Sequence, residues 1–126
     1  EVVFVNPRIE DPDAYVPAAK LCNDIAARFD LDLDWIAGLG IVQDFAVEGN
    51  EDLFRGLREE YPHYFPDRID QHSMAKDCRY GEYSAVLNIK PYRDSDRCAR
   101  LAHDALVNAD SLRHLEMQEG YAELQE

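Results

Sequence analysis

The stretch from Tyr83 to Lys90 has the period of two that is typical of a β-strand, and it limits the possible folds more than any other pattern in the chain. One face would be apolar and the other mixed: Tyr83, Ala85, Leu87 and Ile89 lie on the first, and Ser84, Val86, Asn88 and Lys90 on the second. Pro91 cannot donate a hydrogen bond to a neighbouring strand, so the pairing is expected to end there.

A helix and a closing strand are expected after this strand. Asp94, Ser95 and Asp96 supply the short acceptors and the negative charge that favour a helix start. The residues that follow form one apolar stripe at helical spacing: Cys98, Leu101, Ala102, Ala105, Leu106 and Ala109. The segment from Leu112 to Met117 is less apolar and is expected to be an edge strand.

The beginning of the chain repeats the order strand, helix, strand. Val2 to Val5 is apolar on both faces, as a central strand is. A helix is expected from about residue 14 or 16 to Phe29, and Trp35 to Val47 is again apolar with a period of two. The helix would bury one stripe, formed by Tyr15, Ala18, Cys22, Ile25 and Phe29.

Together the two halves predict an α+β fold, a ferredoxin-like two-layer sandwich with doubled βαβ units and a four-stranded antiparallel or mixed sheet. A helix that starts at Asn50 and an irregular segment from Tyr61 to Tyr80 would be inserted at about residues 50–80. This segment is rich in aromatic residues, so it is expected to be packed and not disordered. The length of 126 residues fits a single domain over 1–126.

The chain is strongly acidic, with 26 Asp and Glu against 13 Lys and Arg, and a formal net charge of −13. Such a charge repels nucleic acid and anionic membranes, so neither is an expected partner. Two explanations remain open. The acidity could be an adaptation to a salty or high-GC cell, or it could form a surface that imitates nucleic acid and occupies a basic partner protein.

The cysteines and the apolar runs indicate a cytoplasmic protein. Three cysteines is an odd number and no CxxC pair is present, which favours reduced thiols over a disulfide framework or a zinc ribbon. No apolar run approaches the roughly 20 residues that a membrane helix needs. The sequence at Glu1 to Asn6 does not have the pattern of a secretory signal.

The irregular segment contains most of the candidate binding residues. Imidazole and carboxylate groups could bind a ligand there, and aromatic side chains with Pro62 and Pro66 could form either an exposed contact surface or a small core beneath the loop. The candidates are Tyr61, His63, Tyr64, Phe65, Asp67, Asp70 and His72. His63 and His72 are weak candidate metal ligands, because nine residues of irregular chain separate them, and no metal or cofactor is predicted.

Three residues are weak candidates for catalysis: His72, Cys78 and His114. Cys78 lies between Lys76 and Arg79, which would favour the thiolate if the thiol were exposed, and His72 could act as its base. His114 would share a strand face with Glu116, as an acid–base pair or simply as edge-strand charge.

No nucleophile elbow, phosphate loop or cofactor fingerprint is present, which favours a non-enzymatic role. The first hypothesis is an acidic protein–protein interaction module, a homo-oligomer that acts as an inhibitor or nucleic-acid mimic and masks a basic partner surface. The alternative is a small-molecule or metal-dependent enzyme or ligand-binding protein with its site at residues 61–80.

Overall fold

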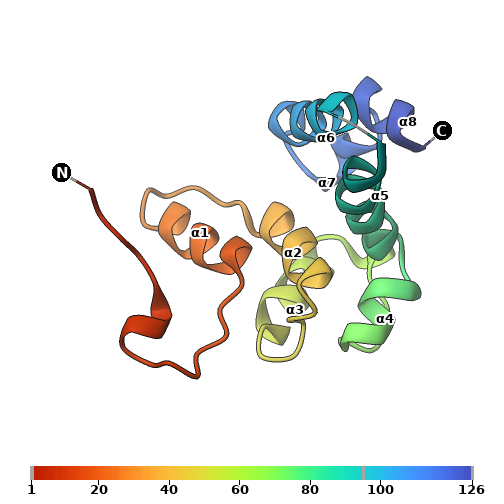
Figure 1. The fold of residues 1–126 in the computed structure, drawn as a ribbon. Helices are drawn as coiled ribbons and strands as arrows, with labels where there is room; N and C mark the ends of the chain where they lie inside the picture. The colour runs from red at the N-terminus through yellow and green to blue at the C-terminus, as the bar shows by residue number, and fades with distance from the viewer. Residues whose placement is uncertain (1, 95, 126) are drawn as a thin grey trace.

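The structure, a computed structural model, describes residues 2–94 and 96–125, and over residues 89–94 it describes the backbone alone. Within these ranges the chain is helical and has no β-strand (Figure 1). The predicted α+β ferredoxin-like sandwich, with its doubled βαβ units and four-stranded sheet, is therefore wrong. None of the described helices combines the length and the hydropathy that crossing a bilayer requires.

The described part of the chain contains eight α-helices and two short 3₁₀-helices. They are η1 (Pro7–Ile9), α1 (Ala18–Ala27), α2 (Asp34–Gln43), α3 (Glu51–Glu60), η2 (Pro62–Tyr64), α4 (Gln71–Lys76), α5 (Arg79–Asp94), α6 (Asp96–Asn108), α7 (Leu112–Leu115) and α8 (Glu119–Gln125).

Helix α5 holds the two sides of the molecule together. It packs against α2 and α4 on one side and against α6 and α8 on the other. In Figure 1, α1, α2 and α3 lie to the left of α5, α6 and α8 lie above it, and α7 lies beside its upper part. The two ends of the described chain consequently lie on opposite sides of the molecule.

The predicted strand at residues 83–90 is part of α5, and the helix continues through Pro91. Among its described side chains, those of Tyr80, Tyr83, Ser84 and Leu87 are buried, and these four have the spacing of one helix face. Tyr83 and Leu87 fit a period of two and a helical period equally well. The two patterns differ at Ser84, which the strand pattern places on the mixed face and the helix buries completely.

Ser84 can be buried because its hydroxyl has partners on α2. It donates to the carbonyl oxygen of Leu39 at 2.6 Å and accepts from the Nε2 atom of Gln43 at 3.0 Å. A buried hydroxyl without such bonds would destabilise the fold. This polar pair therefore fixes the position of α5 along α2.

The predicted strand at residues 35–47 is largely α2, a helix that is apolar nearly all round. Its buried residues are Trp35, Ala37, Gly38, Leu39, Ile41 and Val42. A short apolar run is compatible with either a buried strand or a buried helix, which explains the error. Gly38 and Gly40 do not form a trough on a sheet. A Cβ on Gly38 would meet the Tyr80 hydroxyl of α5, and one on Gly40 would meet Ala19 of α1.

The other two predicted strands are also absent. Residues 2–5 precede η1 without regular structure and are exposed. Residues 112–115 form α7, which buries Leu112 and Leu115 completely, so this segment is part of the core and not a sheet edge. The helix expected after Asp94 is α6, which begins at Asp96, while Ser95 lies outside the described residues.

Helices α1 and α2 are each followed, within three residues, by a residue in the left-handed conformation that is not glycine. Asp30 has a φ of 59° and Phe45 a φ of 56°. In each case the next amide donates back to the carbonyl five residues earlier, Leu31 to Ala26 and Ala46 to Ile41. These are Schellman caps, in which glycine is the usual residue at the left-handed position.

Candidate functional site

The aromatic residues of the 61–80 segment form a packed cluster. Tyr61 is buried, and Tyr64 and Phe65 are half-buried. Phe65 stacks on Tyr80 with ring centroids 4.6 Å apart, and Tyr64 contacts the rings of both Tyr61 and Tyr83. Of the two sequence-based interpretations, this arrangement favours a small core beneath the loop over an exposed contact surface.

An arginine–tyrosine–glutamate cluster covers this core. The Nη2 atom of Arg79 donates to both carboxylate oxygens of Glu116, at 2.9 and 2.7 Å. The hydroxyl of Tyr83 donates to Glu116 at 2.8 Å, and the guanidinium lies 4.7 Å from the ring centre of Tyr64. The Tyr83 hydrogen bond and the Arg79 guanidinium lower the pKa of Glu116. A carboxylate held in this way is a weak base, and its role is to join α5 to the end of α7.

The candidate ligands His63, Asp67, Asp70 and His72 do not converge. His63, Asp67 and His72 are exposed, and Asp70 is the N-cap of α4, accepting from the Ser73 amide at 2.8 Å. That backbone hydrogen bond is the main reason why the pKa of Asp70 is lowered. Among the described residues, no three His, Cys, Asp or Glu side chains gather in a way that could hold a metal ion.

A broad hollow of about 670 Å³ lies between the end of α2 and α4. Asp70 and His72 border it, together with Phe45, whose ring is exposed. Asp70 and His72 belong to the seven residues predicted to bind a ligand, and the fold brings both to the border of this hollow. The carboxylate of Asp70 is already occupied by its helix-capping bond and by an ion pair with Arg68, and His72 is one of several polar side chains at the border of the hollow.

The surroundings of Cys78 do not favour a nucleophile. Its thiol is half-buried, donates to the carbonyl oxygen of Met74 and accepts from the Gly81 amide. Burial raises the pKa of Cys78, so the thiolate fraction falls instead of rising. His114, the remaining candidate, is exposed on α7 and lies 3.7 Å from Asp110, while its expected partner Glu116 is bound to Arg79.

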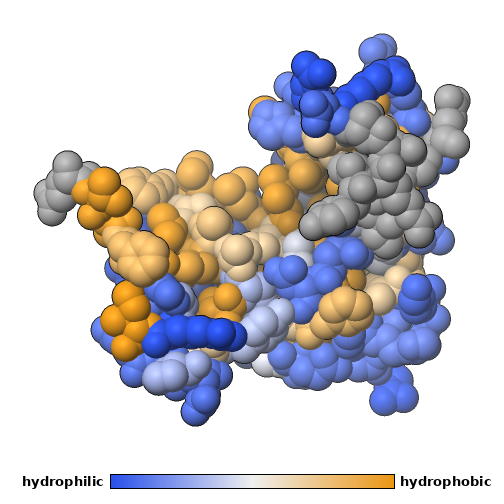
Figure 2. Space-filling model, in the orientation of Figure 1, coloured by the Kyte–Doolittle hydropathy of each residue, from blue (hydrophilic) through white to orange (hydrophobic). Residues whose placement is uncertain are grey.

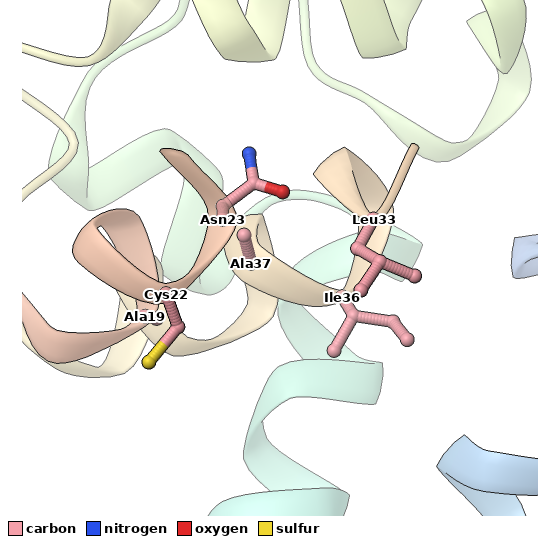
Figure 3. Close-up of a pocket in the computed structure, with 6 residues that line it drawn as sticks. All are labelled: Ala19, Cys22, Asn23, Leu33, Ile36 and Ala37. Carbon is pink, nitrogen blue, oxygen red and sulfur yellow. The ribbon is translucent and has the colours of Figure 1, made fainter. Parts of the chain in front are cut away.

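The structure shows a pocket between α1 and α2 that sequence reasoning missed. It has a volume of about 150 Å³ and is lined by Ala19, Cys22, Asn23, Leu33, Ile36 and Ala37 (Figure 3). All of these except Asn23 present apolar or thiol groups. The pocket exists because α1 turns back through the Asp30 cap, so that the start of α2 lies beside α1.

Asn23 is the single polar residue of the pocket, and it is only 7% exposed. Its Nδ2 atom donates to the carboxylate of Asp34 at 2.7 Å, but its Oδ1 atom is buried without a hydrogen-bond partner. In Figure 3 the nitrogen points away from the other five side chains and the oxygen lies on the side of Leu33. Asp34 fixes this orientation, because the reversed amide would place two acceptors against each other.

A large exposed apolar surface lies over the same part of the chain. In Figure 2, hydrophobic residues gather over the N-terminal segment, α1 and α2. We call the exposed side chains of this part of the chain the N-terminal apolar surface. It consists of Val2, Val3, Phe4, Val5, Ile9, Tyr15, Val16, Ile25, Phe29, Leu31 and Leu33.

The apolar stripe predicted for the first helix is largely exposed, and its two ends, Tyr15 and Phe29, lie outside α1. Cys22 is exposed, Ile25 is 42% exposed and Phe29 is 73% exposed, whereas the buried residue of this helix is Asn23. Periodicity identifies a stripe, but it does not say which neighbour covers it. An apolar helix stripe for which the predicted fold offers no covering element is the sequence signal that could have identified this surface.

The chain matches no protein-family model, no curated protein and no solved structure in the comparisons made with it. Its function must therefore be inferred from its own geometry.

Proposed function

We propose that this chain is a non-catalytic protein-interaction module whose N-terminal apolar surface binds a basic partner protein. The observation that carries this proposal is the orientation of α1, an amphipathic helix that turns its apolar stripe to solvent. Contiguous exposed apolar patches are uncommon on isolated domains and mark interaction sites. The stripe includes Phe29, a large rigid side chain of the kind that dominates binding energy in interfaces.

The charge of the chain supports a basic partner. The stretch from Asn23 to Asp34, which supplies Ile25, Phe29, Leu31 and Leu33 to the surface, contains four aspartates and one arginine, and one of these aspartates, Asp24, forms an ion pair with Lys20. Acidic groups around an apolar centre steer a basic protein into contact. The same charge opposes self-association of two chains at −13 each and repels an anionic lipid surface.

The polar clusters elsewhere support a non-catalytic role. Each charged or nucleophilic group that the fold holds in place is already bonded within the protein: Glu116 to Arg79, Asp70 to the start of α4, and Cys78 to its own helix turn. These bonds stabilise the packing of α4, α5 and α7, and they occupy the three groups named here.

Site-specific photo-crosslinking in the protein's own cells tests the proposal. A benzophenone amino acid replaces Phe29 in one variant and Val107 in a matched control, since Val107 is 67% exposed but lies on α6. We expect the variant at position 29 to capture a basic protein. When the irradiation is repeated in a cell lysate, the yield should fall as salt is added before irradiation.

Equal capture from both positions would mean that the apolar surface has no special role, and the proposal would be wrong. Absence of any crosslinked protein from position 29 would contradict it equally. A Phe29→Ser variant that folds normally and still co-purifies with the captured partner at full yield would also count against it.

A further inference from the structure

We infer that the partner protein docks as a basic amphipathic helix, which lies along α1 and places one apolar side chain in the pocket between α1 and α2. This inference rests on the proposed interaction function and identifies the shape and chemistry of the segment that is recognised. It is carried by three features: the spacing of the exposed stripe, the apolar pocket beside it, and the carboxylates before and after it in the chain.

The exposed stripe has the spacing of a helix–helix contact. Its residues are Tyr15, Ala18, Cys22, Ile25 and Phe29, which are all exposed and lie alternately three and four positions apart. A repeat of this kind averages 3.5 residues and forms the seam along which helices pack in coiled coils. Ala18, Cys22 and Ile25 lie on α1 itself, and the other two flank it. The stripe therefore matches a partner helix, whereas the side chains of a strand repeat every two residues and would not follow it.

The pocket lies beside this stripe, because Cys22 belongs to both: its exposed side chain also lines the pocket. Figure 3 shows Cys22 of α1 and Ile36 of α2 pointing to the same side of the helix pair, while the amide of Asn23 points to the other side. A side chain that entered from the stripe would meet hydrocarbon and one thiol. A helix laid along the stripe is consequently in place to fill the pocket.

The size and lining of the pocket favour an apolar occupant. Its volume is about 150 Å³, comparable to a cavity that holds one benzene ring in a protein interior. One leucine, methionine or phenylalanine side chain fills a space of this order. A polar side chain would lose its hydration there without gaining a hydrogen bond, which costs free energy. The pocket therefore selects one apolar residue of the partner helix.

Carboxylates before and after the stripe favour a basic helix. They are Glu10, Asp11, Asp13, Asp30 and Asp32, and all five are exposed. Arg8 and Arg28 are the basic residues in the same two parts of the chain, and Asp24 does not contribute because it is paired with Lys20. Lysine or arginine on the partner helix would therefore meet attractive charge. A second copy of this acidic chain would meet repulsion.

Two peptides of identical composition test the helical geometry. Each is a capped chain of about 15 residues, long enough as a helix to span the stripe, and is built from leucine, lysine and alanine. In the first, the leucines alternate three and four positions apart and share one helix face. In the second, they lie two positions apart and cannot share a face. Each peptide is titrated into the ¹⁵N-labelled protein at physiological salt. We expect the first to bind about 10-fold more tightly and to shift amide signals of α1 and α2.

Cys22 supplies an independent readout within the stripe. Cys22 is exposed, and Cys98 on α6 is half-buried and serves as an internal reference. The first peptide is expected to slow the alkylation of Cys22 by N-ethylmaleimide and to leave the rate at Cys98 unchanged. Mass spectrometry of the two cysteine-containing fragments measures both rates in one sample.

Further peptides test the charge and the pocket. A version of the first peptide with glutamate in place of lysine should bind more weakly at low salt, and the difference should shrink near 1 M salt. In the lysine version, each leucine is also replaced in turn by alanine. One of these replacements should weaken binding more than the others, because the pocket has room for one side chain.

Two variants of the protein locate the contact on α1. Ile25→Lys places a charge in the stripe, and Ala27→Lys places the same charge two residues further on, where the helix turns it to the opposite side. Both residues are exposed, so both variants are expected to fold. Ile25→Lys should weaken binding of the first peptide about 10-fold, and Ala27→Lys should change it by less than about 2-fold. If Ile25→Lys does not fold, the two peptides of identical composition still decide the question on the wild-type protein.

Equal affinity for the two peptides of identical composition would overturn the helical partner, and signals that shift only outside α1 and α2 would overturn the site. Equal losses from every leucine replacement would overturn the role of the pocket. Tighter binding of the glutamate peptide would overturn the basic charge of the helix. Protection of Cys22 that grows with protein concentration, without any peptide, would assign the stripe to a second copy of the chain. Successful crosslinking from position 29 together with equal binding of the two peptides would overturn this inference alone and leave the interaction module in place.

Discussion

The hydroxyl of Tyr80 donates to the carbonyl oxygen of Trp35 at 2.7 Å, and it passes over Gly38 to do so. A Cβ on Gly38 would lie 2.3 Å from the Tyr80 oxygen and 3.1 Å from a ring carbon of Phe54. Tyr80 and Phe54 are both fully buried, so neither ring can move into solvent. The close packing of α5 on α2 therefore depends on this glycine.

Gly38→Ala is expected to lower the free energy of unfolding by about 1–3 kcal/mol, because added volume in a packed core displaces its neighbours. Urea unfolding followed by circular dichroism measures the change. Gly56→Ala is the matched control, since Gly56 lies in α3 and a Cβ there would meet nothing within 4 Å. It should raise stability by about 0.5–1 kcal/mol. Similar effects of the two substitutions would contradict the packing argument.

Ser84→Ala is expected to destabilise the protein by about 1–2 kcal/mol, because it leaves the half-buried amide of Gln43 without its partner. A double-mutant cycle with Gln43→Leu separates the pair from the effect of each residue alone. The double variant should be more stable than the sum of the two single changes predicts. Strict additivity would show that the hydroxyl and the amide do not cooperate.

Phe45→Gly is expected to stabilise the protein by about 0.5–1 kcal/mol. Glycine adopts the left-handed conformation at this helix cap without the steric strain that a phenylalanine bears, although its flexibility in the unfolded chain offsets part of the gain. Gly49→Ala tests the same physics in reverse, because Gly49 has a φ of 97° and open space around it. It should cost about 1 kcal/mol. Thermal unfolding measures both changes in stability. Changes of the same sign in the two variants would contradict the prediction.

Glu116→Gln should change how stability depends on pH. The hydrogen bond from Tyr83, followed by Arg79, lowers the pKa of Glu116 from its ordinary value of 4.5. A carboxyl with a lowered pKa contributes stability above that ordinary value, and the contribution is lost as the pH falls through the lower, folded value. At pH 7 the substitution should cost up to about 1 kcal/mol, the usual range for exposed pairs.

The measurement for Glu116 is denaturant unfolding at several pH values between 7 and 3. Wild-type protein should lose more stability than the Glu116→Gln variant as the pH falls below 4.5, since the variant has no carboxylate to protonate. Glu59→Gln, on the exposed face of α3, serves as the control and should follow the wild-type curve. If the stability of Glu116→Gln fell with pH in parallel with that of the wild type, Glu116 would not be the source of the pH dependence.

The helices that could be predicted are those whose apolar residues follow one period only. The stripe of α6 from Cys98 to Ala109 and the inward residues of α3, Phe54 and Leu57, have no alternative period, and both segments are helical. The sequence also indicated that the 61–80 segment would be packed. In α3 and α6 the helical spacing was sufficient to predict the helix, because every apolar residue in the pattern faces the core.

The errors have two physical causes. In α5, Tyr83 and Leu87 satisfy two periods at once, and the polar Ser84 hid the helical face because its partners on α2 are 41 and 45 positions away in sequence. In α2, burial on most sides hides the helical period. The pocket could not be foreseen, because Asn23 has the sequence context of a solvent-facing residue and becomes buried only through the way α1 folds back on α2.

The way α1 is attached affects which part of the protein unfolds locally first. Helix α1 packs principally on α2, and a hydrogen bond from Tyr15 to the carbonyl oxygen of Asp44 fastens the preceding segment, whereas α5 is bound on several sides. Elements with few anchoring contacts open at a lower free energy than the whole domain. The amides of α1 should consequently exchange with deuterium long before those of α5. The proposed partner would therefore meet an outer helix that can change its position at low cost, while the helices behind it stay in place.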